Sequence, residues 1–81
     1  MAKAGEVNIT LIHKNKVMDL RIPLNITLNR FEELVAEVYR EKHIELEKGF
    51  TIKITNKRIN IEHDRLLSDF PISDGDTFLV E

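Results

Sequence analysis

The sequence contains no cysteine and only three glycines. The absence of cysteine excludes a disulfide framework, a cysteine-ligated zinc, an iron–sulfur cluster and a thiol nucleophile. Small secreted domains usually depend on disulfides, so a chain of 81 residues without them is expected in the cytosol. Gly5, Gly49 and Gly75 are too far apart in the sequence to form a glycine-rich phosphate-binding loop.

The chain also lacks a dominant charge and a long apolar run. Its 12 Lys and Arg stand against 14 Asp and Glu, which gives a formal net charge of −2, so no bulk charge attracts nucleic acid. No apolar run is longer than that of Phe78–Val80, which has three residues, whereas a membrane helix needs about 20 apolar residues. We therefore expect a cytoplasmic protein without direct membrane insertion, which reaches the inner face of the membrane only through a partner.

The first apolar residues predict a β-hairpin. Val7–Leu11 and Met18–Ile22 each alternate apolar and polar side chains, which is the period of a strand with one buried face. Lys14–Lys16 between them is polar and predicts the turn. Pro23 ends the second strand because it has no N–H for the ladder. The inner face of this hairpin is expected to carry Val7, Ile9, Leu11, Met18, Leu20 and Ile22.

A helical period begins after Thr27. Thr27 is the favoured N-cap, and Asn29, three residues before Glu32, is the alternative. The helix is expected to run to about Lys42 or His43. Its apolar stripe consists of Leu28, Phe31, Val35 and Val38, widened by Leu34.

The remaining segments predict more strands. Phe50–Thr55 alternates again, Arg58–Ile61 is a candidate short fourth strand, and Thr77–Val80 closes the chain after a turn at Asp74–Asp76. The order is β-β-α-β-β-β, which favours an α+β fold of the β-grasp type, a mixed sheet of four to five strands packed on one helix. Residues 1–6 are expected to form a short flexible tail and residues 7–81 a single domain.

Several short motifs resemble those of known proteins. The segment Ile61–Ile72 is similar to the matching stretch of ubiquitin, with an acidic turn, an Arg and a Leu-Ser-Asp-aromatic turn in the same order. Among ubiquitin-like proteins, the chain resembles the YukD/EsaB family of the bacterial type VII secretion system. This resemblance is carried by the second strand, Met18–Ile22, and by the runs His63–Leu66 and Ile72–Asp76.

The resemblance implies a ubiquitin-like fold and a non-catalytic protein-binding module. The module would be an accessory or regulatory cytosolic component of type VII secretion, and its partner a cytosolic part of the membrane-embedded machinery. Ubiquitin-like modifiers and sulfur carriers need a Gly-Gly tail, but no glycine follows Gly75. Two alternatives stay open: a modifier or sulfur carrier whose Gly-Gly tail is missing from these 81 residues, and a β-grasp domain excised from a larger protein.

The sequence offers two candidate partner-binding surfaces. Glu33, Glu37 and Glu41 stand four residues apart and form an acidic ladder on one helix face, which is either a solvated face or a docking surface for a basic partner. The outward side of the sheet is mostly polar and carries Lys53 in its middle. Ile12 and Val17, with Ile59 as a third member, are the residues that could form an apolar spot there.

No residue pattern indicates catalysis, a cofactor or a metal. His13, His43 and His63 are separated by thirty and twenty residues, so no helix or hairpin spacing links them as ligands. The two serines, Ser68 and Ser73, both fall in expected turns and pair with no base. We therefore expect a protein that is not an enzyme, with no cofactor and no nucleic-acid partner.

Overall fold

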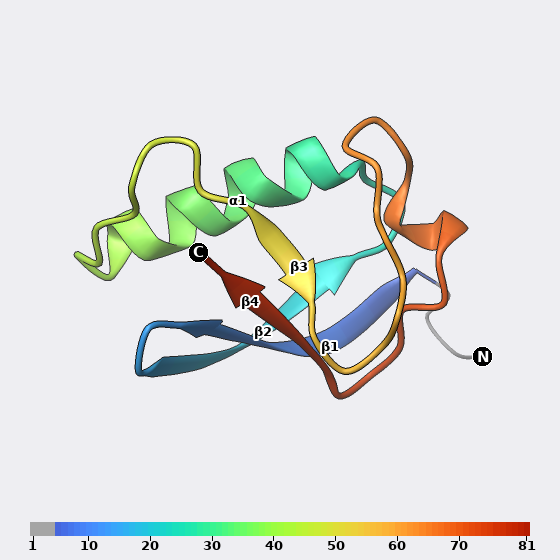
Figure 1. Cartoon of the computed structure of the whole chain (residues 1–81), viewed down its shortest axis with the longest axis horizontal. Coiled ribbons are helices and arrows are strands. Elements are labelled where there is room, and N and C mark those ends of the chain that lie inside the picture. Colours follow the sequence, from blue (N-terminus) through green and yellow to red (C-terminus); the bar gives the residue numbers. More distant parts are fainter. Residues whose placement is uncertain (1–4) are drawn as a thin grey trace.

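The computed structural model describes residues 5–81 and shows one helix packed on one sheet (Figure 1). Most of the predicted flexible tail, residues 1–4, lies outside the described residues, and the first strand already begins at Glu6. The elements are β1 (Glu6–His13), β2 (Lys16–Pro23), α1 (Leu28–Glu41), β3 (Ile52–Ile54), the short 3-10 helix η1 (Leu67–Asp69) and β4 (Asp76–Val80).

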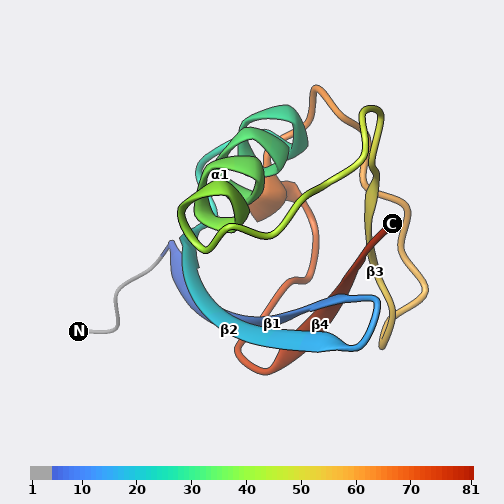
Figure 2. The same ribbon diagram turned by 90° about the vertical axis from the view of Figure 1, so that its left-hand side faces the viewer.

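The four strands form a mixed sheet in the order β2-β1-β4-β3. β1 pairs antiparallel with β2 and parallel with β4, and β3 pairs antiparallel with β4. The sheet curves around α1, which covers its concave face (Figure 2). The predicted α+β fold of the ubiquitin-like β-grasp type, with a mixed sheet on one helix, is confirmed.

The predicted hairpin forms and is longer than expected. Its pairing runs from Glu6 opposite Pro23 to His13 opposite Lys16, so only Lys14 and Asn15 make the turn. Lys14 has a φ of 58°, because two-residue hairpin turns require a positive φ at one or both central positions. Side chains alternate as the sequence predicts along β1, where every second residue is buried.

The helix begins where Thr27 predicts and buries a slightly different stripe. The Thr27 Oγ1 accepts a hydrogen bond from the Arg30 N–H at 3.1 Å, so Thr27 is the N-cap and the alternative Asn29 is wrong. Leu34 and Val38 are only half-buried, because the core lies more toward the side of Tyr39. The buried residues of α1 are Leu28, Phe31, Val35 and Tyr39.

The later strands depart from the prediction. β3 is confined to Ile52–Ile54, shorter than the expected Phe50–Thr55. Residues 58–61 form no strand, so the candidate fourth strand is wrong. The Lys57 ammonium donates hydrogen bonds to the Pro71 carbonyl and the Ser73 hydroxyl, which ties the chain to residues 71–73 instead of turning it back along β3.

The core lies between α1 and the concave face of the sheet. Phe31 is fully buried, and its ring meets the Phe78 ring edge-to-face at a centroid distance of 5.5 Å. Ile9, Ile52 and Leu67 are buried in the same cluster. The outer face of the sheet is therefore left without a covering layer from the described residues, and it is the first place to look for a binding site.

Candidate protein-binding site

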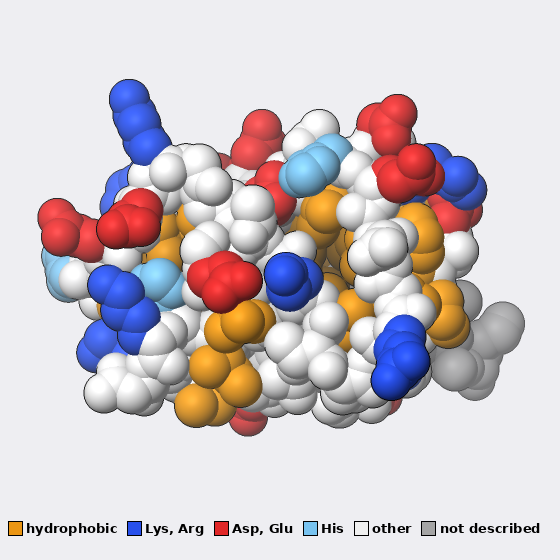
Figure 3. Space-filling view, in the orientation of Figure 1, with side chains coloured by type: hydrophobic (Ala, Val, Ile, Leu, Met, Phe, Trp, Pro, Cys, Tyr) orange, Lys and Arg blue, Asp and Glu red, His pale blue; other side chains and the backbone are white. Residues whose placement is uncertain are grey.

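A row of apolar side chains crosses the outer face of the sheet. Ile12 of β1 stands opposite Val17 of β2 on one side and opposite Leu79 of β4 on the other. Their chain neighbours Leu11, Phe78 and other alternate residues point into the core, so these three point outward. Val17 is 68% exposed, and Ile12 and Leu79 are half-buried. We call these three residues the apolar row; Figure 3 shows an apolar patch on this part of the surface.

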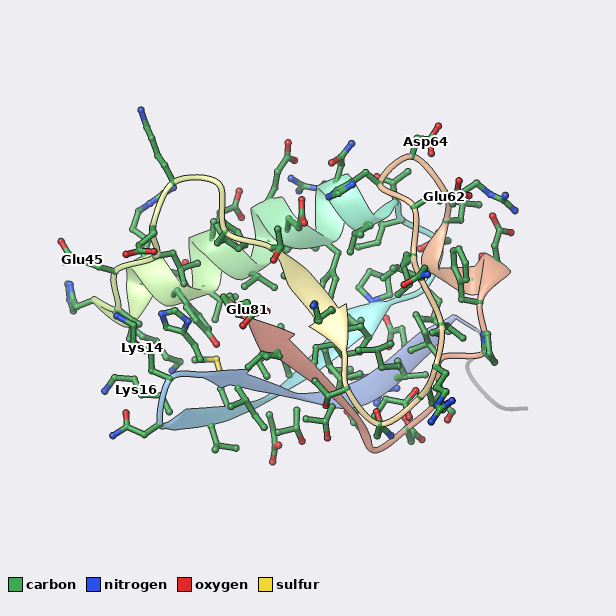
Figure 4. The ribbon with its side chains drawn as sticks, viewed as in Figure 1. Lys14, Lys16, Glu45, Glu62, Asp64 and Glu81 are labelled. Carbon is green, nitrogen blue, oxygen red and sulfur yellow. The ribbon has the colours of Figure 1, made fainter. Side chains whose placement is uncertain are left out.

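A charged pair closes one end of the apolar row. Lys53 of β3 stands opposite Leu79, so it continues the row on the fourth strand. The Lys53 Nζ lies 3.7 Å from Glu81 Oε1, and both side chains are exposed. Figure 4 shows Glu81 at the tip of β4. The predicted sheet-face residues Ile12, Val17 and Lys53 thus lie in one line across the sheet.

The rest of the outer face is polar and internally hydrogen-bonded. The Thr10 hydroxyl donates to Asp19 Oδ1 at 2.9 Å. Arg21 donates through Nε to Glu6 Oε1 at 2.9 Å and through a terminal nitrogen to Asn8 Oδ1 at 3.2 Å. The apolar row is therefore confined to the hairpin end of the sheet. The neighbouring rows are polar, and their side chains form hydrogen bonds with one another.

The acidic ladder lies on α1, away from the outer face of the sheet. Glu33, Glu37 and Glu41 are all exposed. Glu33 pairs with Arg30 at 3.0 Å, whereas no ion pair within residues 5–81 involves Glu37 or Glu41. The structure thus presents two candidate surfaces on different elements, the apolar row on the sheet and the acidic ladder on α1.

Sequence reasoning missed Leu79 and misplaced Ile59. Leu79 joins the row only because β4 pairs in parallel with β1, a contact between distant parts of the chain. Ile59 was a candidate third member of the apolar spot, but it is partly buried and packs against the core cluster. The alternation Thr77-Phe78-Leu79-Val80 was the available signal, since it assigns Leu79 to the face opposite Phe78.

A buried ion pair lies apart from both surfaces. Asp76, expected in a turn, is the first residue of β4 and is buried. Its carboxylate accepts from Lys57 Nζ at 2.8 Å, from the Ser73 N–H at 2.9 Å and from Asn56 Nδ2 at 3.0 Å. Burial alone would raise the pKa of Asp76, but these hydrogen bonds outweigh it and hold the pKa below its ordinary value. All of these hydrogen-bond partners come from the neighbouring loops, so the pair of Lys57 and Asp76 joins β4 to the segment after β3.

Two of the three histidines, His13 and His63, make contacts within the fold. His13 is buried, and its Nδ1 lies 2.8 Å from the Val80 carbonyl oxygen, to which it donates when protonated there. His63 Nε2 lies 3.3 Å from Glu32 Oε2 and links the segment before η1 to the helix. Within residues 5–81, no three His, Asp or Glu side chains gather as a candidate metal site.

Within residues 5–81, an open groove lies beside the end of the helix. It has a volume of about 980 Å³ and is bounded by the loop that connects α1 to β3. Arg40 and Lys48 line it together with Glu45 and Glu47, so charges of both signs surround it. It contains no convergent set of groups of one chemistry that would select a ligand.

Residues 6–80 match the family described as WXG100 protein secretion system (Wss), protein YukD. The chain belongs to this family. It is thus a ubiquitin-like accessory protein of type VII secretion, as the motifs in its sequence predict. The family description names a component of a secretion system and no reaction.

One sequence relative and two solved structures are similar to this chain. An uncharacterised protein of Clostridium acetobutylicum is 30% identical over 74 residues, which cover 91% of this chain and 80% of that protein. The ubiquitin-like domain of an Arabidopsis thaliana protein superposes with a TM-score of 0.74 at 13% identity, over 100% of this chain and 81% of that one. Ubiquitin of Caldiarchaeum subterraneum gives a TM-score of 0.66 at 19% identity, over 94% and 91%. At these identities the two structures show the fold alone.

A chain from an enzyme complex has the same fold. A chain of the toluene 4-monooxygenase HD complex superposes with a TM-score of 0.71 at 12% identity. The fold therefore does not decide by itself whether a protein takes part in catalysis. Across residues 5–81, no helix has the length and apolar character needed to cross a bilayer.

Proposed function

We propose that the YukD-family chain is a non-catalytic binding module, with residues 7–81 as a single ubiquitin-like domain. It works in the cytoplasm as an accessory or regulatory component and docks on a cytosolic part of the membrane-embedded type VII machinery. The observation that supports this most is the apolar row, in which Val17, Ile12 and Leu79 lie in register on an uncovered sheet face. Family membership supplies the class of partner.

The position of the apolar surface on the sheet also supports a binding role. A solvated sheet face is expected to alternate polar side chains, as the rows of Thr10 with Asp19 and Asn8 with Arg21 do here. Val17 is 68% exposed, and it lies at the end of the row farthest from the Lys53–Glu81 pair. An apolar centre with a charged rim is the usual composition of a protein interface.

The test uses a pair of variants on one strand. Thr77 and Leu79 lie on the same face of β4, two residues apart, and both are half-buried. Leu79→Lys places a charge within the apolar row, whereas Thr77→Lys places the same charge within the polar row. Both proteins are first checked for an unchanged circular dichroism spectrum and then compared in a strain whose own copy of the gene is deleted.

The proposal predicts that Leu79→Lys abolishes secretion of a WXG100 protein and capture of the cytosolic secretion components, while Thr77→Lys retains both. Val17→Lys is expected to behave like Leu79→Lys, because Val17 forms the exposed end of the row. Normal secretion with both row variants would remove the row from the function. Loss of secretion with Thr77→Lys alone would move the contact to the polar part of the sheet.

A further inference from the structure

β2 leaves one side of its backbone unpaired. It is one of the two edge strands of the sheet, and within residues 5–81 it pairs only with β1. The hydrogen bonds of Asn8 show which groups are free: its N–H donates to Asp74 Oδ1 at 2.8 Å, and its carbonyl accepts from the Gly75 N–H at 2.8 Å. Asn8 therefore directs its backbone toward β4, and its register partner Arg21 directs its own away from β1.

The same alternation applies along the whole strand. Every second residue of an antiparallel edge strand presents its N–H and carbonyl outward, so Val17 and Asp19 share this orientation with Arg21. The Leu24 N–H donates to the Gly5 carbonyl. The even-numbered residues of β2 therefore direct their backbone groups toward β1, and the odd-numbered residues direct theirs outward. The free edge thus offers the backbone groups of Val17, Asp19 and Arg21, whose side chains are all exposed.

Edge strands of this kind accept another strand unless charges, proline or a bulge prevent it. Pro23 is the last residue of β2 and removes only one outward donor at the end of the strand. The charges on the outward-facing positions are of opposite sign, Asp19 and Arg21. Charges of one sign would repel a second β2, whereas this pair is complementary to itself.

We propose that a second copy of this chain pairs with β2 in antiparallel orientation, about a two-fold axis at Leu20. Asp19 then stands opposite the partner's Arg21, and Arg21 stands opposite the partner's Asp19. Their outward N–H and carbonyl groups bond to one another, and the Val17 N–H reaches the carbonyl of the partner's Pro23. The two sheets continue into one sheet of eight strands, since each copy contributes four.

Alternative registers are less favourable. A shift of the axis to Asp19 places Asp19 opposite the partner's Asp19, and a shift to Arg21 places two arginines face to face, in each case like charges directly opposed. A shift by one residue brings outer-face side chains of one copy to the inner face of the other. The axis at Leu20 is the register in which both charged residues meet the opposite sign.

The inner side of the same edge also has apolar surface to cover. Leu20 is half-buried on β2, and Leu34 is half-buried on α1 outside the core cluster. Glu32 contacts His63 on the flank of α1 toward the segment after β3. Because residues two apart point to nearly opposite sides of a helix, Leu34 lies on the flank toward β2. The second copy therefore covers Leu20. Leu34 lies on the helix flank that is above the same edge of the sheet.

The main test is a charge swap measured with the full chain by sedimentation velocity over a range of concentrations. The wild type is expected to show a concentration-dependent dimer. Asp19→Arg and Arg21→Asp each bring two like-charged pairs together in the dimer, so each should raise the dissociation constant by at least about tenfold. An equimolar mixture of the two variants should dimerise as tightly as the wild type, because every pair across the axis is again of opposite sign.

Three results would overturn the proposal: a wild type that stays monomeric at the highest concentration, single variants that dimerise as well as the wild type, or a mixture without recovery. A monomeric wild type would identify Asp19 and Arg21 as charges that protect the edge. Circular dichroism of each variant excludes unfolding as the cause of a lost dimer.

A cross-link tests the axis itself, since the chain contains no other cysteine. Leu20→Cys places each new thiol opposite its own copy, whereas Asp19→Cys places the two thiols diagonally, beyond the separation that a disulfide bridges easily. Under mild oxidation, Leu20→Cys is expected to form the covalent dimer faster, although Asp19 is the more exposed position. Equal or reversed rates would contradict an axis at Leu20.

Discussion

Lys57 Nζ lies 2.8 Å from Asp76 Oδ2, and the Asp76 side chain is only 4% exposed. This pair connects the segment after β3 to the first residue of β4, which in turn stands opposite Ile9 of the central strand β1. Removing the charge of Asp76 leaves the Lys57 ammonium without its counter-charge. An amide in its place has one acceptor oxygen instead of the two that accept from Asn56 and Ser73.

Asp76→Asn is therefore expected to lower the free energy of unfolding at neutral pH by about 1.5–3 kcal/mol, the usual range for hydrogen bonds to a charged group. Chemical denaturation measures the change. The control is Asp64→Asn, because Asp64 is exposed at the tip of its loop (Figure 4). This control should alter the free energy by less than about 0.5 kcal/mol.

The pH dependence of this effect has a definite sign. The pKa of Asp76 is lowered in the folded protein, so the unfolded chain binds the proton more readily and protonation favours unfolding. The contribution of Asp76 is complete above the ordinary aspartate pKa of about 3.9 and is lost as the pH falls through its lower folded pKa. The stability difference between wild type and Asp76→Asn should thus shrink below about pH 4. A difference that stays constant down to pH 2 would show that Asp76 stabilises by something other than its charge.

Phe31→Ala tests the centre of the core. Phe31 is fully buried against Phe78, so its truncation should cost about 3–5 kcal/mol, a large part of the roughly 5–15 kcal/mol that a domain has. Leu34→Ala is the comparison on the same helix, because Leu34 is half-buried and outside the core cluster. Denaturation of both variants at low protein concentration should separate them by at least about 2 kcal/mol. Similar losses would mean that the helix is rotated from the position described.

The hairpin and the helix could be predicted from the sequence because their signals are local. Alternation over Val7–Leu11 fixes which side chains point inward, and Thr27 marks the helix start by a hydrogen bond to a residue three positions away. The motifs that predicted the family are also short and continuous in the sequence, and the family match over residues 6–80 confirms them.

The remaining features depend on contacts between distant segments. Leu79 enters the apolar row only through the parallel pairing of β4 with β1, and no local pattern fixes that register. Residues 58–61 alternate like a strand but pair with none, because Lys57 is tied to residues 71–73. The burial of Asp76 had no sequence signal either, since Asp-Gly-Asp is a usual turn sequence.

The helix cap provides a small and specific prediction. The Thr27 Oγ1 satisfies the free N–H of Arg30, so Thr27→Ala should destabilise the protein by about 0.5–2 kcal/mol. Asn29, the rejected alternative, is exposed within the first turn. Asn29→Ala should therefore leave stability unchanged or raise it slightly, because alanine has the higher helix propensity. Thermal denaturation compares the stability of the two variants. A larger loss of stability in Asn29→Ala than in Thr27→Ala would show that Asn29 is the N-cap.

The acidic ladder gives the last prediction, as a second proposed docking surface for a basic segment of the secretion machinery. Glu37 and Glu41 are four residues apart, exposed, and without an ion pair within residues 5–81. Like charges at this spacing destabilise a helix by a few tenths of a kcal/mol. Replacing both by lysine should therefore leave the fold intact and raise the free energy of unfolding by up to about 0.5 kcal/mol, because Glu33 then meets an opposite charge four residues away.

The same double variant, Glu37→Lys with Glu41→Lys, should lose capture of the secretion components and secretion of a WXG100 protein. Wild-type association should slow with added salt, because exposed charges are screened beyond about 8 Å at physiological ionic strength. Lys53→Glu is the charge control on the sheet, where Lys53 pairs with Glu81 at the end of the apolar row. Normal secretion by the helix variant together with failure of Lys53→Glu would show that the sheet face alone binds the partner. The acidic ladder would then be a solvated face. The repulsion between its like charges would lower helix stability slightly without serving a binding role.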